Sequence, residues 1–86
     1  PTHYNLPLLQ CIFCNFEDPR LMGHLDHTLL SHIVTLIRKE IPADVPCYFF
    51  FDEIQHVADW EKWLHTQLER PKNNTFVVTG SNSRLL

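Results

Sequence analysis

Two adjacent acids, Asp52 and Glu53, directly follow the apolar run Cys47–Phe51 and are the residues best suited to chemistry. At about 5 Å, two carboxylates repel by ~3 kcal/mol at an effective dielectric of 20, and by under ~1 kcal/mol in water. A hydrated Mg²⁺ removes this penalty, since it prefers oxygen ligands and is held by one or two carboxylates plus substrate phosphates. Asp52 would then orient the metal, and Glu53 would act as general base on a water. The alternative is that both acids simply begin an exposed loop.

The surrounding pattern predicts five elements that position this pair. Apolar spacing, proline and glycine mark a strand over 8–16, a helix over 26–41, a strand over 47–51, a helix from Asp59 to Pro71 and a strand over 75–79. We take Asp59 as the N-cap of the second helix. The unbroken apolarity of 47–51 is typical of a central parallel strand with helices on both faces. The order strand-helix-strand-helix-strand therefore predicts a doubly wound α/β fold with parallel strands.

Polar side chains follow each of the three strands. They are Asn15, Glu17 and Asp18 after the first, Asp52 and Glu53 after the second, and Thr79, Ser81, Asn82 and Ser83 after the third. Ligands of open parallel sheets bind at the carboxyl ends of the strands. We therefore expect these groups to meet at one edge.

Length, charge and cysteine content exclude several classes of protein. Eighty-six residues form at most one small domain, and a net charge of −3 with scattered basic residues argues against a nucleic-acid surface. No apolar run approaches the ~18 residues of a membrane span. Three cysteines cannot all pair with one another, which favours a reducing, cytoplasmic compartment. Because the chain begins at Pro1 without methionine, we expect it to be an excerpt from a longer protein.

The cysteines, histidines and tryptophans could suggest metal binding or a partner surface, but each has a structural interpretation. Cys11 and Cys14 have metal-ligand spacing, but residues three apart in a strand point to opposite faces, so both read as small buried hydrophobes. The six histidines form no i, i+4 pair within a helix and read as surface residues. Trp60 and Trp63 read as the packed face of the second helix.

Three segments together resemble a known family. Tyr48–Gln55 reads as a Walker B motif, an apolar strand followed by Asp-Glu, and Val57–Trp63 continues it. Residues 15–21 and 79–83 are similar to the endings of the second and fourth strands, the latter being the sensor-1 region. In this order they resemble the core domain of prokaryotic AAA-type ATPases that commonly carry a further, poorly characterised C-terminal domain.

The resemblance implies a three-layer P-loop NTPase fold, with ATP and Mg²⁺ as cofactors. Asp52 would be the Mg²⁺-associated acid and Glu53 the catalytic base. Ser81, or its neighbours Thr79 and Asn82, would sense the γ-phosphate. Asn15 would be the glutamate-switch residue that can hold Glu53 in an idle rotamer. A homo-oligomer or a partner protein would be the target of the coupled conformational change.

The departure from the family is the missing P-loop. No Gly-x-x-x-x-Gly-Lys-Ser/Thr occurs, and the only glycines are Gly23 and Gly80. We therefore interpret residues 1–86 as a single partial domain, the second to fourth strands of an ATPase core, with the P-loop expected before Pro1. Alone, the chain is not expected to hydrolyse ATP appreciably.

Two alternatives stay open beside this interpretation. One is a metal-dependent nuclease or phosphohydrolase in which Glu17, Asp52 and Glu53 converge on a metal. The other is a non-catalytic, ATPase-like scaffold module.

Overall fold

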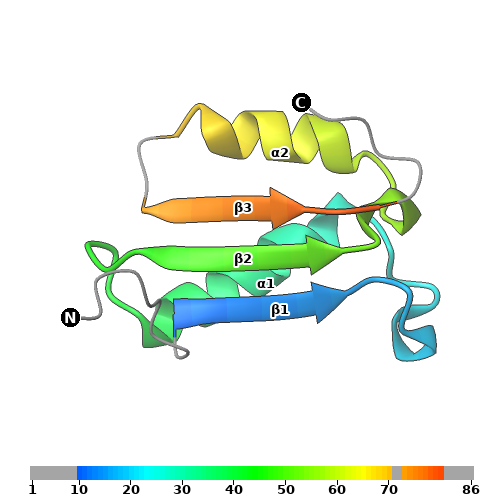
Figure 1. The fold of residues 1–86 in the computed structure, drawn as a ribbon, viewed down its shortest axis with the longest axis horizontal. Coiled ribbons are helices and arrows are strands. Elements are labelled where there is room, and N and C mark those ends of the chain that lie inside the picture. Colours follow the sequence, from blue (N-terminus) through cyan, green and yellow to red (C-terminus); the bar gives the residue numbers. More distant parts are fainter. Residues whose placement is uncertain (1–9, 71–72, 81–86) are drawn as a thin grey trace.

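The computed structural model describes residues 10–70 and 73–80, and shows a parallel sheet with two crossover helices (Figure 1). The elements in chain order are β1 (Cys11–Asn15), α1 (His27–Glu40), β2 (Cys47–Asp52), α2 (Trp60–Leu68) and β3 (Asn74–Val78), with short 3₁₀ turns η2 (Pro19–Leu21) and η3 (Ile54–His56). The predicted α/β class and the alternation of strands and helices are confirmed.

The sheet has the order β1-β2-β3, and both neighbouring pairs are parallel. Asn15 is the register partner of Asp52. The hydrogen bonds continue past the strand ends, from Phe16 N to the Asp52 carbonyl (3.0 Å) and from Thr79 N to the Phe51 carbonyl (3.0 Å). The three carboxyl ends are thus tied together at one edge, as the strand order predicted.

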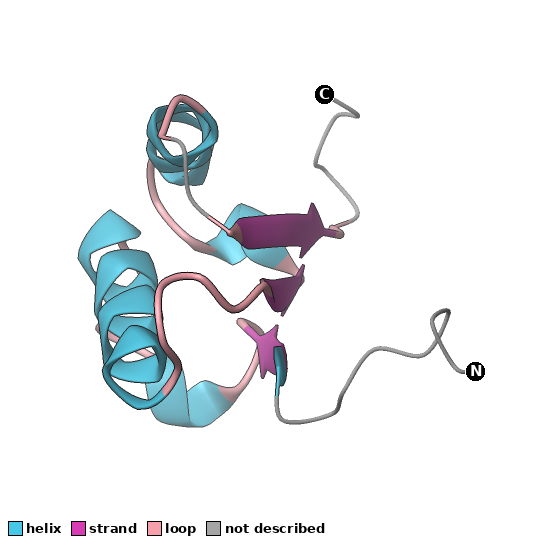
Figure 2. Ribbon diagram, turned by 90° about the vertical axis from the view of Figure 1, so that its left-hand side faces the viewer, coloured by secondary structure: helices cyan, strands magenta, loops and turns pink. Residues whose placement is uncertain are grey.

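Both helices lie on the same face of the sheet (Figure 2). Side chains of β2 alternate accordingly: Cys47, Phe49 and Phe51 are buried, whereas Tyr48 and Phe50 are only partly covered. We expected helices on both faces, but the described residues supply one helical layer. An unbroken apolar run does not indicate which part of a protein covers each face, so the pattern could not assign the second cover.

Aromatic packing joins the helices to the covered face. Trp63 and Phe76 stack edge-to-face with ring centroids 5.3 Å apart, and both rings lie against Phe51. Trp60 and Trp63 are each 7% exposed, which confirms their predicted packing role. The Trp63 indole also donates to Ser31 Oγ at 2.8 Å, linking α2 to α1.

The ends of two elements differ from expectation. Within the described residues β1 covers only 11–15, and Phe16 leaves the strand as a buried core residue. Asp59 stands at the N-cap position of α2, but it adopts a left-handed backbone (φ 61°) and its side chain accepts no capping hydrogen bond, so the predicted capping role was wrong. At α1 the cap is Asp26, which accepts from Thr28 N at 2.9 Å.

Arg38 fastens the amino ends of β2 and β3. Its guanidinium donates to the carbonyls of Pro42 (2.7 Å), Val45 (2.8 Å) and Asn73 (2.8 Å), and to Asn74 Oδ1 (2.7 and 3.0 Å). Arg38 lies in the last turn of α1, where its positive charge also suits the negative end of the helix dipole. In the structure it holds the loop after α1 against the start of β3.

The described histidines are all exposed, as predicted. No helix in residues 10–70 and 73–80 is long and apolar enough to span a membrane.

Candidate functional site

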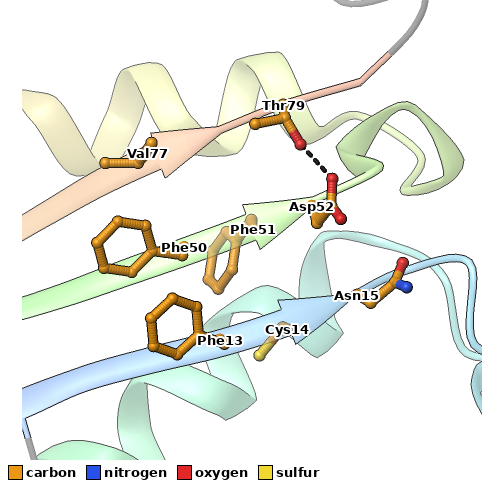
Figure 3. Close-up of a pocket in the computed structure, with 8 residues that line it drawn as sticks. All are labelled: Phe13, Cys14, Asn15, Phe50, Phe51, Asp52, Val77 and Thr79. Atoms are coloured by element: carbon orange, nitrogen blue, oxygen red, sulfur yellow. Dashed lines mark hydrogen bonds between the residues drawn. The ribbon is translucent and has the colours of Figure 1, made fainter. Parts of the chain in front are cut away.

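A row of polar side chains crosses the open face of the sheet at its carboxyl end (Figure 3). Asn15, Asp52 and Thr79 come from or directly follow β1, β2 and β3, and all three are exposed. Two residues earlier on each strand lies an apolar row. It consists of Phe13, Phe50 and Val77, with the rings of Phe13 and Phe50 stacked 4.7 Å apart. The period of two along a strand places both rows on the same face.

A hollow of about 410 Å³ lies over these rows. Its lining consists of Phe13, Cys14, Asn15, Phe50, Phe51, Asp52, Val77 and Thr79. It is apolar along the strands and polar at their carboxyl ends.

Asp52 and Thr79 are hydrogen-bonded to each other. The Thr79 hydroxyl donates to Asp52 Oδ1, so neighbouring strands fix the direction of the carboxylate. Its other oxygen accepts no side-chain hydrogen bond from the described part of the chain. An exposed carboxylate beside a hydroxyl is a set of hard oxygen donors, and this set fits a hydrated Mg²⁺.

Glu53 adopts a left-handed backbone conformation, with φ 57° and ψ 46°. This conformation costs a residue with a Cβ about 1 kcal/mol or more. It is imposed by the turn η3, whose first amide, Ile54 N, donates to the Thr79 carbonyl at 2.9 Å. The chain therefore turns sharply between Asp52 and the buried Ile54.

The Glu53 side chain is half-buried and lies near two other side chains. The sequence predicted a contact with one of them, Glu17, but not with the other, His56. Ligand atoms of Glu17, Glu53 and His56 lie within 4.8 Å of one another. His56 Nε2 is 3.8 Å from Glu17 Oε2. The nuclease alternative predicted Glu17 and Glu53 together with Asp52, whereas this group contains His56. His56 was expected only to be a surface residue, and nothing in its spacing indicated this contact.

Gln55 is the partner of Glu53 that sequence reasoning missed. Its Nε2 donates to Glu53 Oε1 at 2.6 Å. The glutamate-switch residue predicted from the resemblance, Asn15, accepts instead from Glu17 N at 2.9 Å through its Oδ1. No hydrogen bond between Asn15 and Glu53 occurs among the described residues, and the switch role stays a prediction. The sequence shows that an amide side chain, Gln55, follows two residues after Glu53. It does not show the geometry of the turn that brings the two side chains together.

Two further predicted site residues, Ser81 and Asn82, lie outside the described residues. Of the proposed γ-phosphate sensors, only Thr79 is placed, and it contacts Asp52.

The guanidinium of Arg20 is paired with the carboxylate of Asp18. It donates two side-chain hydrogen bonds to Asp18 Oδ2, the shorter at 2.6 Å, and a third to Oδ1. These side-chain hydrogen bonds are the main reason why the pKa of Asp18 falls to about 2. The ion pair between Arg20 and Asp18 is therefore present at neutral pH.

Comparisons with known proteins agree with the geometry. The family model described as "AAA domain" matches residues 2–86. An uncharacterised protein of Methanocaldococcus jannaschii is 36% identical over 75 residues, which are 87% of this chain and 16% of that protein. The chain therefore spans about a sixth of the length of this relative. No solved structure gives a significant match.

Proposed function

The chain belongs to the AAA domain family, and on that premise we propose that it forms part of an ATP-binding, ATP-hydrolysing core. Residues 1–86 would be one partial domain that contributes the second to fourth strands with the Walker B and sensor-1 regions. The match over 2–86 and the span of only 16% of a relative support this division.

One observation carries the proposal: an exposed acid, its hydroxyl partner and a second acid stand together at the carboxyl end of a parallel sheet. Asp52 and Thr79 are joined across β2 and β3, and Glu53 follows in a strained backbone conformation. Ligands of such sheets bind at this edge. Strained residues concentrate at functional sites, where the surrounding structure holds them.

Asp52 is the proposed Mg²⁺-associated acid, because its carboxylate is exposed and fixed by Thr79. When bound, Mg²⁺ would neutralise charge on the phosphates of ATP. Thr79, with Ser81 and Asn82 beyond the described residues, would sense the γ-phosphate. Asn15, in register with Asp52, would complete the polar row.

Glu53 is the proposed general base. It would accept a proton from the water that attacks the γ-phosphorus in line, while the β–γ phosphoanhydride bond breaks and ADP leaves. The phosphate-binding backbone must then come from another part of the protein, because residues 1–86 contain no P-loop. Hydrolysis would be coupled to another copy or to a partner protein. A cytoplasmic location fits the free thiols of Cys11, Cys14 and Cys47.

ATP turnover of the intact protein with Glu53→Gln tests this function. We expect a loss of about 100-fold, the lower range for removing a general base. The matched control is Glu61→Gln, an exposed acid in the first turn of α2, which should leave turnover unchanged. Wild-type turnover in the Glu53 variant would eliminate the assignment.

The group of Glu17, Glu53 and His56 favours a second candidate, a metal-dependent phosphohydrolase or nuclease. Carboxylates and imidazole are ligands of transition metals such as Zn²⁺. This candidate predicts that His56→Ala abolishes hydrolysis of a nucleic-acid or phosphoester substrate. The ATPase proposal assigns His56 no such role. A scaffold module without catalysis would show neither activity.

A further inference from the structure

Within residues 10–70 and 73–80, Gln55 is hydrogen-bonded directly to the proposed base. Its Nε2 donates to Glu53 Oε1 at 2.6 Å, and both side chains are half-buried. Hydrogen bonds of an amide donor to an ionised carboxylate are shorter and stronger than those between neutral groups. This bond therefore has the energy to select one rotamer of Glu53.

The turn that carries Gln55 is anchored on both sides. Ile54 and Val57 are each 1% exposed. Ile54 N donates to the Thr79 carbonyl at 2.9 Å, and Val57 N donates to the Ile54 carbonyl at 2.9 Å. Gln55 lies between these two residues in η3, so its backbone has little freedom. The position from which its amide reaches Glu53 is thus fixed by the core.

The hydrogen bond between Gln55 and Glu53 follows a left-handed backbone conformation at Glu53. In an extended strand, residues two apart have their Cα atoms about 7 Å apart and point to the same side. At φ 57° and ψ 46° the chain reverses direction, and the side chains at 53 and 55 meet. The left-handed backbone and the hydrogen bond thus occur in the same turn.

We propose that Gln55 is a positioning residue for Glu53, an inference that rests on the proposed ATPase function. Gln55 holds Oε1 of the base, which leaves the second carboxylate oxygen to accept the proton of the attacking water. The role is distinct from that proposed for Asn15, which lies in the row with Asp52 and accepts from Glu17 N.

The test is Gln55→Met in the intact protein, assayed for ATP hydrolysis. Methionine keeps the length of the side chain and removes the donor. We expect kcat to fall about tenfold with KM for ATP unchanged, because the bond acts on the base and not on nucleotide binding. The matched control is Gln67→Met, the same change at a half-buried position of α2, which should preserve kcat.

A second measurement separates positioning from a structural role. In the background of Glu53→Gln, the additional change Gln55→Met should leave the residual rate where it was, since a residue that acts through Glu53 has nothing further to lose. A further tenfold loss in that background would overturn the inference, and so would wild-type kcat in the single variant.

Failure of the inference is distinguishable from failure of the proposed function. If Glu53→Gln is inactive while Gln55→Met has wild-type kcat, the ATPase proposal stands and the role of Gln55 is refuted. If Glu53→Gln itself retains wild-type turnover, both proposals are refuted.

Discussion

Replacing Arg38 by methionine removes the guanidinium that fastens the amino ends of β2 and β3, far from the proposed active site. Three of its hydrogen bonds are partly buried and go to two acceptors, the Val45 carbonyl and Asn74 Oδ1. The bonds to Pro42 and Asn73 are exposed, so water replaces them at little cost. At about 1.5 kcal/mol for each partly buried, charge-assisted acceptor, Arg38→Met should lower the free energy of unfolding by about 3 kcal/mol.

Urea unfolding of the 86-residue chain measures this loss through the fluorescence of Trp60 and Trp63, the two tryptophans, both buried. With an m-value of about 1 to 1.5 kcal/mol/M, the midpoint should fall by about 2 to 3 M. This is a large share of the stability of so small a chain. Arg38→Lys keeps the charge but not the fork of donors, and should lie between wild type and Arg38→Met.

The matched control is Lys39→Met, at the next and exposed position of the same helical turn. Its unfolding free energy should change by no more than about 0.5 kcal/mol. Equal midpoints for Arg38→Met and Lys39→Met would show that the guanidinium bonds do not hold this end of the sheet.

Two further predictions concern the carboxyl end of the sheet. Thr79→Val removes the donor to Asp52 and should lower ATP turnover of the intact protein about tenfold. The control Thr75→Val, earlier on β3, should leave turnover unchanged. Equal turnover of the two variants would contradict a role for the Asp52–Thr79 bond. Arg20→Gln should raise the pKa of Asp18 from about 2 toward its ordinary value, seen by NMR titration of the carboxyl carbon. The pKa of Asp18 is lower in the folded than in the unfolded protein, so the pair stabilises the folded protein at pH values above the unfolded pKa. This stabilisation is lost as the pH falls toward 2. An unchanged titration of Asp18 in the variant would refute the contact.

The path of the chain was predictable because it depends on local patterns. Pro42 ends a helix whose apolar residues recur at helical spacing, and the run before Asp52 has the length and apolarity of a buried strand. The placement of Asp52 and Thr79 at one edge follows from parallel strands alone, and the structure joins the two side chains.

The contacts of Glu53 were not predictable in the same way. Its left-handed backbone is set by a hydrogen bond from Ile54 to Thr79, a residue on another strand. No propensity assigns that conformation to glutamate. Without it, neither the bond from Gln55 nor the approach of Glu17 could be derived.

Local rules could not predict the long-range contacts of Arg38 or the missing capping bond of Asp59. Each had a generic role at a helix end, and local rules assign that role without regard to neighbours. Arg38 donates to Val45 in the loop after α1, and to Asn73 and Asn74 at the start of β3. The two acceptors near β3 are known only once the fold is known. Asp59 has a left-handed backbone conformation, and its carboxylate makes no capping bond. The residue before it, Ala58, is held by a hydrogen bond from its amide to the Leu25 carbonyl.

Glu53 is the residue proposed to remove a proton from water during ATP hydrolysis, and a comparison of ATP binding with ATP turnover in one variant tests this role. Equilibrium binding of ATP with Mg²⁺ and release of phosphate should be measured on the intact Glu53→Gln protein beside the wild type. If Glu53 is the base, ATP binding is retained in the variant while phosphate release falls about 100-fold. Phosphate release at the wild-type rate would contradict this role.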